Sequence, residues 1–240
     1  MRLKLIVTED GSHSIEGPGG LTYHSTFGAL QESRHIFLER GLRALIARET
    51  ETATPEGPKE PKEPVRIFEM GLGAGLNVLL SLAHAIDTGR RIEYEAVETA
   101  PLPLWLTGTL NYCRAMGRPE LQQLFEAVHT GAWETKLGLH PAFALYKTRR
   151  DVREHRLTQP ADIVFYDAFD PAAQPELWTA EVFARLYRQM NAGAVLVTYC
   201  CKGEVQRAMR SAGFYVEKLP GPPGKREMIR AWHARPVEGS

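Results

Sequence analysis

This chain of 240 residues has no net charge, few cysteines and no long apolar run. Its 29 Lys and Arg residues balance 29 Asp and Glu residues, so no global field draws it to nucleic acid, a membrane surface or an acidic ligand. The three cysteines, Cys113, Cys200 and Cys201, lack metal-ligand spacing, which favours a reduced, cytoplasmic protein without a metal site. Because no apolar run is long enough for a signal peptide or a membrane span, we expect no membrane partner.

Hydrophobic residues make up 43% of the chain, which is enough for a sizeable core. After residue 64, apolar runs rich in β-branched residues alternate with runs of helical periodicity, which predicts an α/β fold with a mostly parallel sheet covered on both faces. The last two of seven such runs are separated only by "PGPPGKR", too short for a parallel crossover, and predict a closing antiparallel hairpin. The seven runs are "VRIFEM", "RIEYEAVE", "FALYKT", "ADIVFYDAF", "AVLVTY", "FYVEKL" and "EMIRAWH".

The chain divides at "ETETATPEGPKEPKEP", residues 49–64, which has nothing large and apolar to bury and is typical of a linker. Residues 1–48 form an N-terminal extension, in which a short strand or hairpin precedes a helix with Ser25 or Thr26 as a possible cap. Residues 65–235 form the main domain.

A glycine-rich turn follows the first strand of that domain. Gly71, Gly73 and Gly75 let the backbone approach a ligand, and the next helix directs its free N–H groups toward it. The spacing is E-x-G-x-G-x-G, and Leu76 stands where a nicotinamide-binding fingerprint needs a third glycine or alanine. The turn therefore favours another ligand.

Two acidic residues at strand ends indicate which ligand. Glu69 would repel a pyrophosphate but suits a cation, and S-adenosylmethionine carries a sulfonium and an ammonium. Glu98 ends the second strand, where an acid can accept hydrogen bonds from ribose hydroxyls. A solvated acid at a strand end is the simpler alternative.

A second group of residues lies in "ADIVFYDAFDPAAQPELW". Its strand ends at Asp167, at the edge of the sheet where ligands bind, and Phe169 offers a ring for base stacking. Asp167 as a helix cap and Phe169 as a core residue remain open alternatives.

Several motifs together resemble the MnmC-type tRNA (5-methylaminomethyl-2-thiouridine) methyltransferase domain. They are "YHSTFGALQESRHIF", "FEMGLGAGLN", "YDAFDPAAQPELWT", "VTYCCKG" and "GPPGKREMIRA", and the resemblance covers most of residues 8–231. It implies a class I S-adenosylmethionine-dependent methyltransferase fold and methylation of the aminomethyl group on a wobble uridine of tRNA. In many bacteria this domain is fused to an FAD-dependent oxidase. We expect a stand-alone form without FAD here, with a separate enzyme supplying the aminomethyl substrate.

Roles for individual residues follow from this chemistry. Asp167 would accept a hydrogen bond from the amine while Phe169 packs against the base, and Asp151 in "YKTRRDV" would accept from the adenine amino group. The substrate-binding residues are expected to be Tyr199 in "VTYCCKG" and, in the stiff "PGPPGKRE" loop, Lys225 and Arg226.

Two other functions stay open. Asp170 makes "DAFDP" similar to the D-x-x-D-P of spermidine synthases, so an aminopropyltransferase is one alternative, although the glycine turn lacks the G-G-G-D-G form of those enzymes. The other is a noncatalytic RNA-binding scaffold on the same fold.

Overall fold

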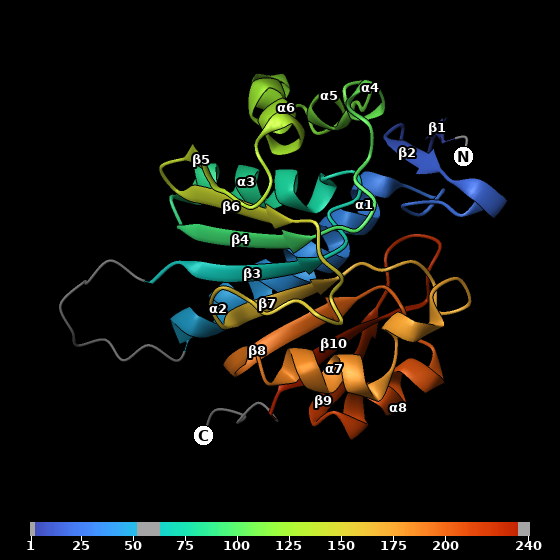
Figure 1. The fold of residues 1–240 in the computed structure, drawn as a ribbon, viewed down its shortest axis with the longest axis vertical. Coiled ribbons are helices and arrows are strands. Elements are labelled where there is room, and N and C mark those ends of the chain that lie inside the picture. The colour runs from blue at the N-terminus through green and yellow to red at the C-terminus, as the bar shows by residue number, and fades with distance from the viewer. Residues whose placement is uncertain (1–2, 52–62, 235–240) are drawn as a thin grey trace.

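An eight-stranded mixed sheet forms the centre of the protein in a computed structural model that describes residues 3–51 and 63–234 (Figure 1). The strand order is β5-β6-β4-β3-β7-β8-β10-β9. Five neighbouring strands run parallel: β6 (Phe143–Thr148), β4 (Ile92–Val97), β3 (Val65–Met70), β7 (Ala161–Tyr166) and β8 (Met190–Thr198). At one edge the predicted hairpin is confirmed, since β9 (Phe214–Pro220) and β10 (Glu227–His233) pair antiparallel.

The sheet has one strand more than the seven predicted. β5 (Lys136–His140) pairs antiparallel with β6 at the other edge, with a register irregularity between Gly138 and His140. Its sequence, KLGLH, is short and no residue of it is fully buried. A strand that is exposed at an edge does not need the continuous apolar run by which the buried strands were predicted.

Helices cover both faces of the sheet (Figure 1). On one face lie α3 (Leu76–Thr88) and α6 (Gln122–Thr130), which follows the short helices α4 (Leu104–Thr107) and α5 (Tyr112–Ala115). On the other lie α7 (Ala180–Tyr187) and α8 (Gly203–Ser211). Consecutive residues of β7 serve the two cores, since Phe165 packs with one and Tyr166 with the other.

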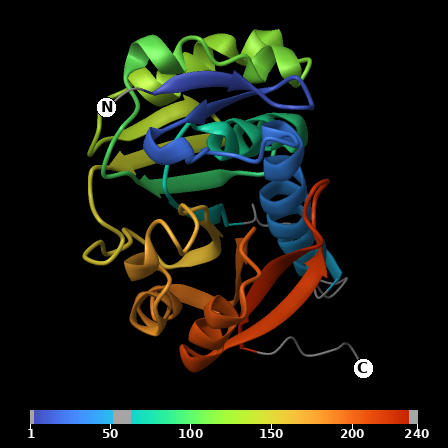
Figure 2. The same cartoon turned by 90° about the vertical axis from the view of Figure 1, so that its right-hand side faces the viewer.

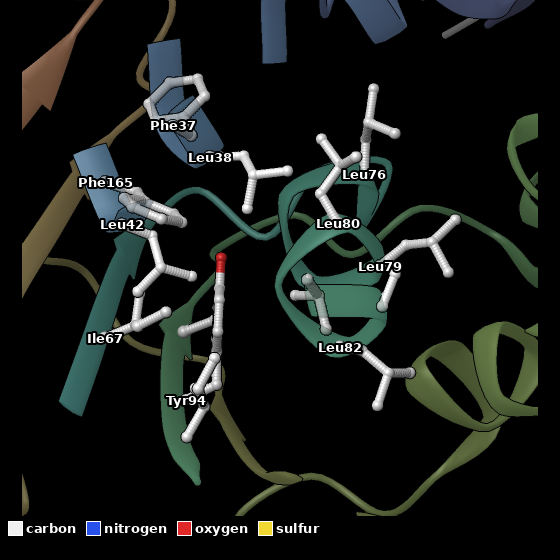
Figure 3. Close-up of a cluster of buried hydrophobic side chains, with 14 of the residues drawn as sticks. Phe37, Leu38, Leu42, Ile67, Leu76, Leu79, Leu80, Leu82, Tyr94 and Phe165 are labelled. Atoms are coloured by element: carbon white, nitrogen blue, oxygen red, sulfur yellow. The ribbon is translucent and has the colours of Figure 1, made fainter. Parts of the chain in front are cut away.

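The N-terminal extension is part of the same core as the main domain. One continuous helical segment contains α1 (Ala29–Ser33), the π-helical turns of η2 (Arg34–Arg43) and α2 (Ala44–Glu51). Phe37 and Leu42 from this segment pack with Ile67, Tyr94 and Phe165 of the sheet (Figure 3). The predicted linker, residues 49–64, begins inside α2, and its residues 52–62 lie outside the described part of the chain.

The prediction that Ser25 or Thr26 caps the N-terminal helix is wrong. The capping residue is Gly28, which has a φ of 149°. Because glycine has no side chain, it cannot itself satisfy the first N–H groups of the helix. These groups instead donate to a hairpin made of β1 (Lys4–Val7) and β2 (His13–Glu16). Ala29 N donates to Thr8 Oγ1, Leu30 N to Ser12 Oγ and Gln31 N to Asp10 Oδ2, at 3.0–3.3 Å. The hairpin thus serves as the helix cap.

Among the helices of the described residues, none combines the length and the apolar character that crossing a membrane requires.

Replacing Asp10 tests this tertiary cap. Its carboxylate accepts hydrogen bonds from Thr8 Oγ1, Ser12 N and Gln31 N, so Asp10→Ala removes one of the three capping bonds and the support of the hairpin turn. We expect the free energy of unfolding to fall by about 1–2 kcal/mol in urea denaturation. Glu9→Ala, which changes an exposed acid in the same turn, is the control and should stay within about 0.5 kcal/mol of the wild type. Equal losses in the two variants would contradict the cap.

Candidate active site

A cavity of about 550 Å³ opens at the carboxyl ends of the parallel strands. Figure 2 looks onto this end of the sheet. Three parts of the chain build its walls: residues 22–27 with Glu32 of α1, the segments after β3, β4, β6, β7 and β8, and Gly224 with Lys225 between β9 and β10. The volume lies in the range of about 300–1,000 Å³ that is usual for small-molecule sites.

Two glycines of the predicted turn form part of the cavity wall. Gly71 has a φ of 87°, and a Cβ there would lie 3.2 Å from the backbone oxygen of Asp167. Gly73 has a φ of 49° and lies against the Tyr23 ring. Gly75 has a different role, since it precedes α3 and packs against His129, outside the cavity lining. Both lining glycines therefore combine a left-handed backbone with a close neighbour.

The acids predicted to hold the ribose and the adenine both line the cavity. Glu98 Oε2 accepts from Gly73 N at 3.0 Å and Glu98 Oε1 from Ala100 N at 2.8 Å, so backbone bonds fix the carboxylate beside the glycine turn. Asp151 forms an ion pair with Arg153, whose Nη2 lies 2.6 Å from Asp151 Oδ2, and this hydrogen bond lowers the pKa of Asp151. Both carboxylates keep oxygen lone pairs that a ligand hydroxyl or amino group can reach.

Beneath the cavity, two carboxylates share one amide. Asn77 Nδ2, in the first turn of α3, donates to Glu69 Oε1 at 2.9 Å and to Asp167 Oδ2 at 3.0 Å. Glu69 is only 1% exposed and does not line the cavity, whereas Asp167 does. Glu69 Oε2 finds no hydrogen-bond partner of standard geometry among the described residues. Glu69 thus lies outside the cavity lining, linked to Asp167 through Asn77, and its predicted role toward the ligand's ammonium stays a prediction.

This arrangement changes the acidity of both carboxyl groups. Burial raises the pKa of Asp167 to about 7, the nearby Glu32 adds to the rise, and the hydrogen bond from Asn77 opposes it. Burial also raises the pKa of Glu69 well above its ordinary range, again against the hydrogen bond from Asn77. A carboxyl group that titrates near neutral pH can exchange a proton with a bound ligand.

Aromatic rings surround the mouth of the cavity beside Asp167. The rings of Phe169 and Tyr23 meet edge to face with centroids 5.0 Å apart. The loop that carries Phe169 is fixed by Trp178 Nε1, which donates to Phe169 O at 2.9 Å, and by Tyr199 Oη, which donates to Ala168 O at 2.7 Å. Phe169, Tyr23 and Tyr199 all line the cavity and offer flat apolar surfaces to a ligand.

The predicted cationic pair separates in the structure. Lys225 lines the cavity, where its Nζ forms an ion pair with Glu32 Oε1 and lies 4.0 Å from the centroid of the Tyr199 ring. Arg226 is exposed and does not line the cavity. Asp170 also lines the cavity and is paired with Lys202 Nζ at 2.6 Å.

Most of the residues predicted for the site therefore meet in one cavity, and three do not. Glu69, Gly75 and Arg226 lie outside its lining. The predicted residues that line it are Gly71, Gly73, Glu98, Asp151, Asp167, Phe169, Tyr199 and Lys225. Tyr23, Glu32 and Asn77 were missed, although each lies within a motif that carried the family resemblance.

Comparisons with known proteins bear on the fold and the family. A family model described as S-adenosyl-L-methionine-dependent methyltransferase matches residues 128–234. The chain is 35% identical over 243 residues to the tRNA 5-methylaminomethyl-2-thiouridine biosynthesis bifunctional protein MnmC of Aromatoleum aromaticum, an alignment that covers 96% of this chain and 35% of that protein. The protein of the same name from Azoarcus sp. strain BH72 is 33% identical, with 94% of this chain and 35% of the relative covered. The chain thus spans about a third of the length of these relatives.

A solved structure, that of MnmC2 from Aquifex aeolicus, has the same fold. It superimposes with a TM-score of 0.75 at 24% identity and covers 98% of this chain and 71% of that one. Fold, cavity and family match together define an S-adenosyl-L-methionine-dependent methyltransferase. Within that class, the chain belongs to the MnmC-type family that its motifs predicted.

The raised pKa of Asp167 predicts a pH-dependent effect on stability. Because the pKa is about 7 in the folded protein and 3.8 is its ordinary value, the folded state holds an extra proton between these limits and loses stability as the pH rises through them. Asp167→Asn removes that buried charge and should raise the midpoint of thermal unfolding by about 3 °C at pH 8. The gain should shrink toward pH 4.

Asp151→Asn is the matched control for this measurement. Its pKa is lowered by the hydrogen bond from Arg153, so its charge favours the folded state and the variant should lose stability at pH 8. A loss of stability in Asp167→Asn at pH 8 would contradict the conclusion that the ionised Asp167 carboxylate destabilises the folded state.

Proposed function

We propose that this methyltransferase transfers a methyl group from S-adenosylmethionine to the aminomethyl nitrogen of a wobble uridine in tRNA, which converts 5-aminomethyl-2-thiouridine to 5-methylaminomethyl-2-thiouridine. The observation that carries the proposal is Asp167, a carboxyl group with a pKa of about 7 that faces the cavity between a glycine turn and an aromatic wall. The names of the MnmC relatives supply the nucleoside.

The methyl donor fits the side of the cavity formed by β3, β4 and β6. Glu98 is oriented by two backbone N–H groups and would accept from the ribose hydroxyls, while Asp151 would accept from the adenine amino group. Gly71 and Gly73 allow the donor to approach the backbone. Asp167, when ionised, supplies negative charge on the side where the donor's sulfonium and ammonium would lie.

The reaction itself needs an unprotonated amine aligned with the carbon–sulfur bond. The nitrogen lone pair forms the new N–CH₃ bond as the S–CH₃ bond breaks, and the electron pair of that bond stays on sulfur. The methylated nitrogen then releases a proton, for which ionised Asp167 is the acceptor at hand. Asn77 donates to Asp167 Oδ2 and so leaves Oδ1 for the amine.

The acceptor base would lie against the aromatic wall. Phe169 and Tyr23 form one continuous apolar surface through their edge-to-face contact, and Tyr199, directly after β8, lines the same cavity. Rings of this kind stack on bases irrespective of their hydrogen-bonding edge. The wall therefore supplies position, and Asp167 supplies the chemistry.

The tRNA backbone would be held by cations around the cavity mouth. Arg150 and Arg153 line it, and Arg226 is exposed on the loop between β9 and β10. A tRNA substrate implies work in the cytoplasm and an amine made beforehand, either by a separate enzyme or by another part of a longer protein. The relatives of this chain carry the word bifunctional in their names and are about three times as long.

A methylation assay tests the proposal directly. Protein and S-adenosylmethionine are incubated with tRNA that bears 5-aminomethyl-2-thiouridine, and nucleosides are analysed by mass spectrometry. We expect the gain of one methyl group on that nucleoside. In Asp167→Asn the single-turnover rate should fall by at least about 100-fold, because the proton acceptor is lost. tRNA with unmodified wobble uridine and the free amine putrescine are the negative controls. Methylation that is unchanged in Asp167→Asn would disprove the role of this carboxylate.

Arg226 tests the proposed contact with RNA. If it meets one phosphate, Arg226→Gln should weaken tRNA binding and reduce the slope of log affinity against log salt by about 1. Arg188→Gln is the control, because Arg188 is exposed at the end of α7. It precedes β8 and so lies at the amino ends of the parallel strands, opposite the cavity. Identical salt slopes in the two variants would remove Arg226 from the interface.

A further inference from the structure

An ion pair joins the two chain segments that close the cavity. Glu32 lies on α1 and Lys225 on the loop between β9 and β10, 193 positions later. Glu32 is 6% exposed, and its second oxygen, Oε2, accepts from Ser25 N at 2.8 Å. A carboxylate this deeply buried is costly unless both oxygens are satisfied. Ser25 and Lys225 together satisfy them.

The same pair fixes the position of the Lys225 ammonium. Its Nζ lies between Glu32 Oε1 and the face of the Tyr199 ring, a geometry in which the ring attracts a cation. The loop is also held by packing, because a Cβ on Gly224 would overlap the ring of Phe27. Lys225 is therefore anchored from three sides and is poorly placed to reach outward to a phosphate.

Both members of the pair line the cavity together with Asp167 and act on it with opposite effects. The negative charge of Glu32 raises the pKa of Asp167, and the positive charge of Lys225 lowers it. The other titratable or hydrogen-bonding groups that act on Asp167 or are influenced by it come from every neighbouring element. They are Glu69 of β3, Tyr94 of β4, Asn77 of α3, Tyr112 of α5 and Tyr199 after β8. None of these groups carries a positive charge, so Lys225 is the one cation among the groups named here that act on Asp167.

We propose that Glu32 is a positioning residue for the methyl transfer, because it holds the Lys225 ammonium against Tyr199 beside Asp167 and so sets, together with Lys225, when that carboxylate accepts a proton. The inference rests on the proposed function and adds a role to two residues at the acceptor side of the site. Glu32 itself touches neither the methyl group nor the amine in this arrangement. It acts through Lys225 and through its own field.

Opposite shifts of one pH profile test the pair. Single-turnover methylation is measured from pH 5 to 9 in the wild type, Glu32→Gln, Lys225→Met and the double variant. The acid limb of the profile is the low-pH range in which the rate rises as Asp167 ionises. Without Glu32, Asp167 ionises more easily, and the acid limb should move to lower pH by about one unit. Without Lys225 it should move up by a similar amount. The double variant should lie between them, and Lys225→Arg should restore the wild-type limb.

A local charge pair at the same mouth provides the control. Lys202→Met breaks the exposed ion pair with Asp170 and should leave the acid limb within about 0.3 unit of the wild type, since exposed pairs are strongly screened. Thermal melts and calorimetry of S-adenosylmethionine binding check that each variant is folded. A merely structural role for Glu32 would lower the melting temperature without displacing the limb, and that outcome overturns the inference.

A second readout separates this inference from the proposed function. In ¹³C NMR, the Asp167 carboxyl carbon is assigned by its absence in Asp167→Asn and titrated in the protein without substrate. Its midpoint should fall in Glu32→Gln and rise in Lys225→Met. If these shifts occur but no aminomethyl-uridine is methylated, the proposed function fails and the charge pair stands. If methylation occurs and the midpoints do not move in opposite directions, the inference fails alone.

Discussion

The sharing of one amide by two buried carboxylates is the constraint on which the site depends. Asn77 donates to Glu69 and to Asp167, and no cation lies directly on either of them among the described residues. Two negative charges so close together in a buried place cannot both ionise without cost. Burial is the main cause of the raised pKa of both groups, and the charge of Asp167 adds to the rise for Glu69. Asp167 can therefore take up a proton near neutral pH.

The fold creates this proximity through the geometry of parallel strands. β3 and β7 are neighbours that end at the same edge, so Glu69 and Asp167 meet although nearly 100 residues separate them. The turn after β3 reverses through Gly71 and Gly73 into α3, which places Asn77 above both strand ends. The same edge brings Glu98 from β4 to the glycine turn. One sheet edge thus supplies the donor side and the reactive carboxylate together.

The features that local sequence patterns encode could be predicted from the sequence. The buried strands are continuous apolar runs, and Glu98 and Asp167 were found because an acid at the end of such a run stands out. β5 was missed because an exposed edge strand has no such run, and the helix cap because its donors and acceptors come from segments about 20 residues apart. Glu32 and Lys225 form a pair across almost the whole chain, and no local pattern signals that kind of contact.

The closing of the cavity by Glu32 and Lys225 has a consequence for biosynthesis. The first wall is made early in translation, and the last arrives only when the β9–β10 loop has left the ribosome. Until then the partly made chain exposes Glu32 without its counter-ion and has no complete chamber. The cavity is therefore complete only once the β9–β10 hairpin has been made and has docked against the first helix.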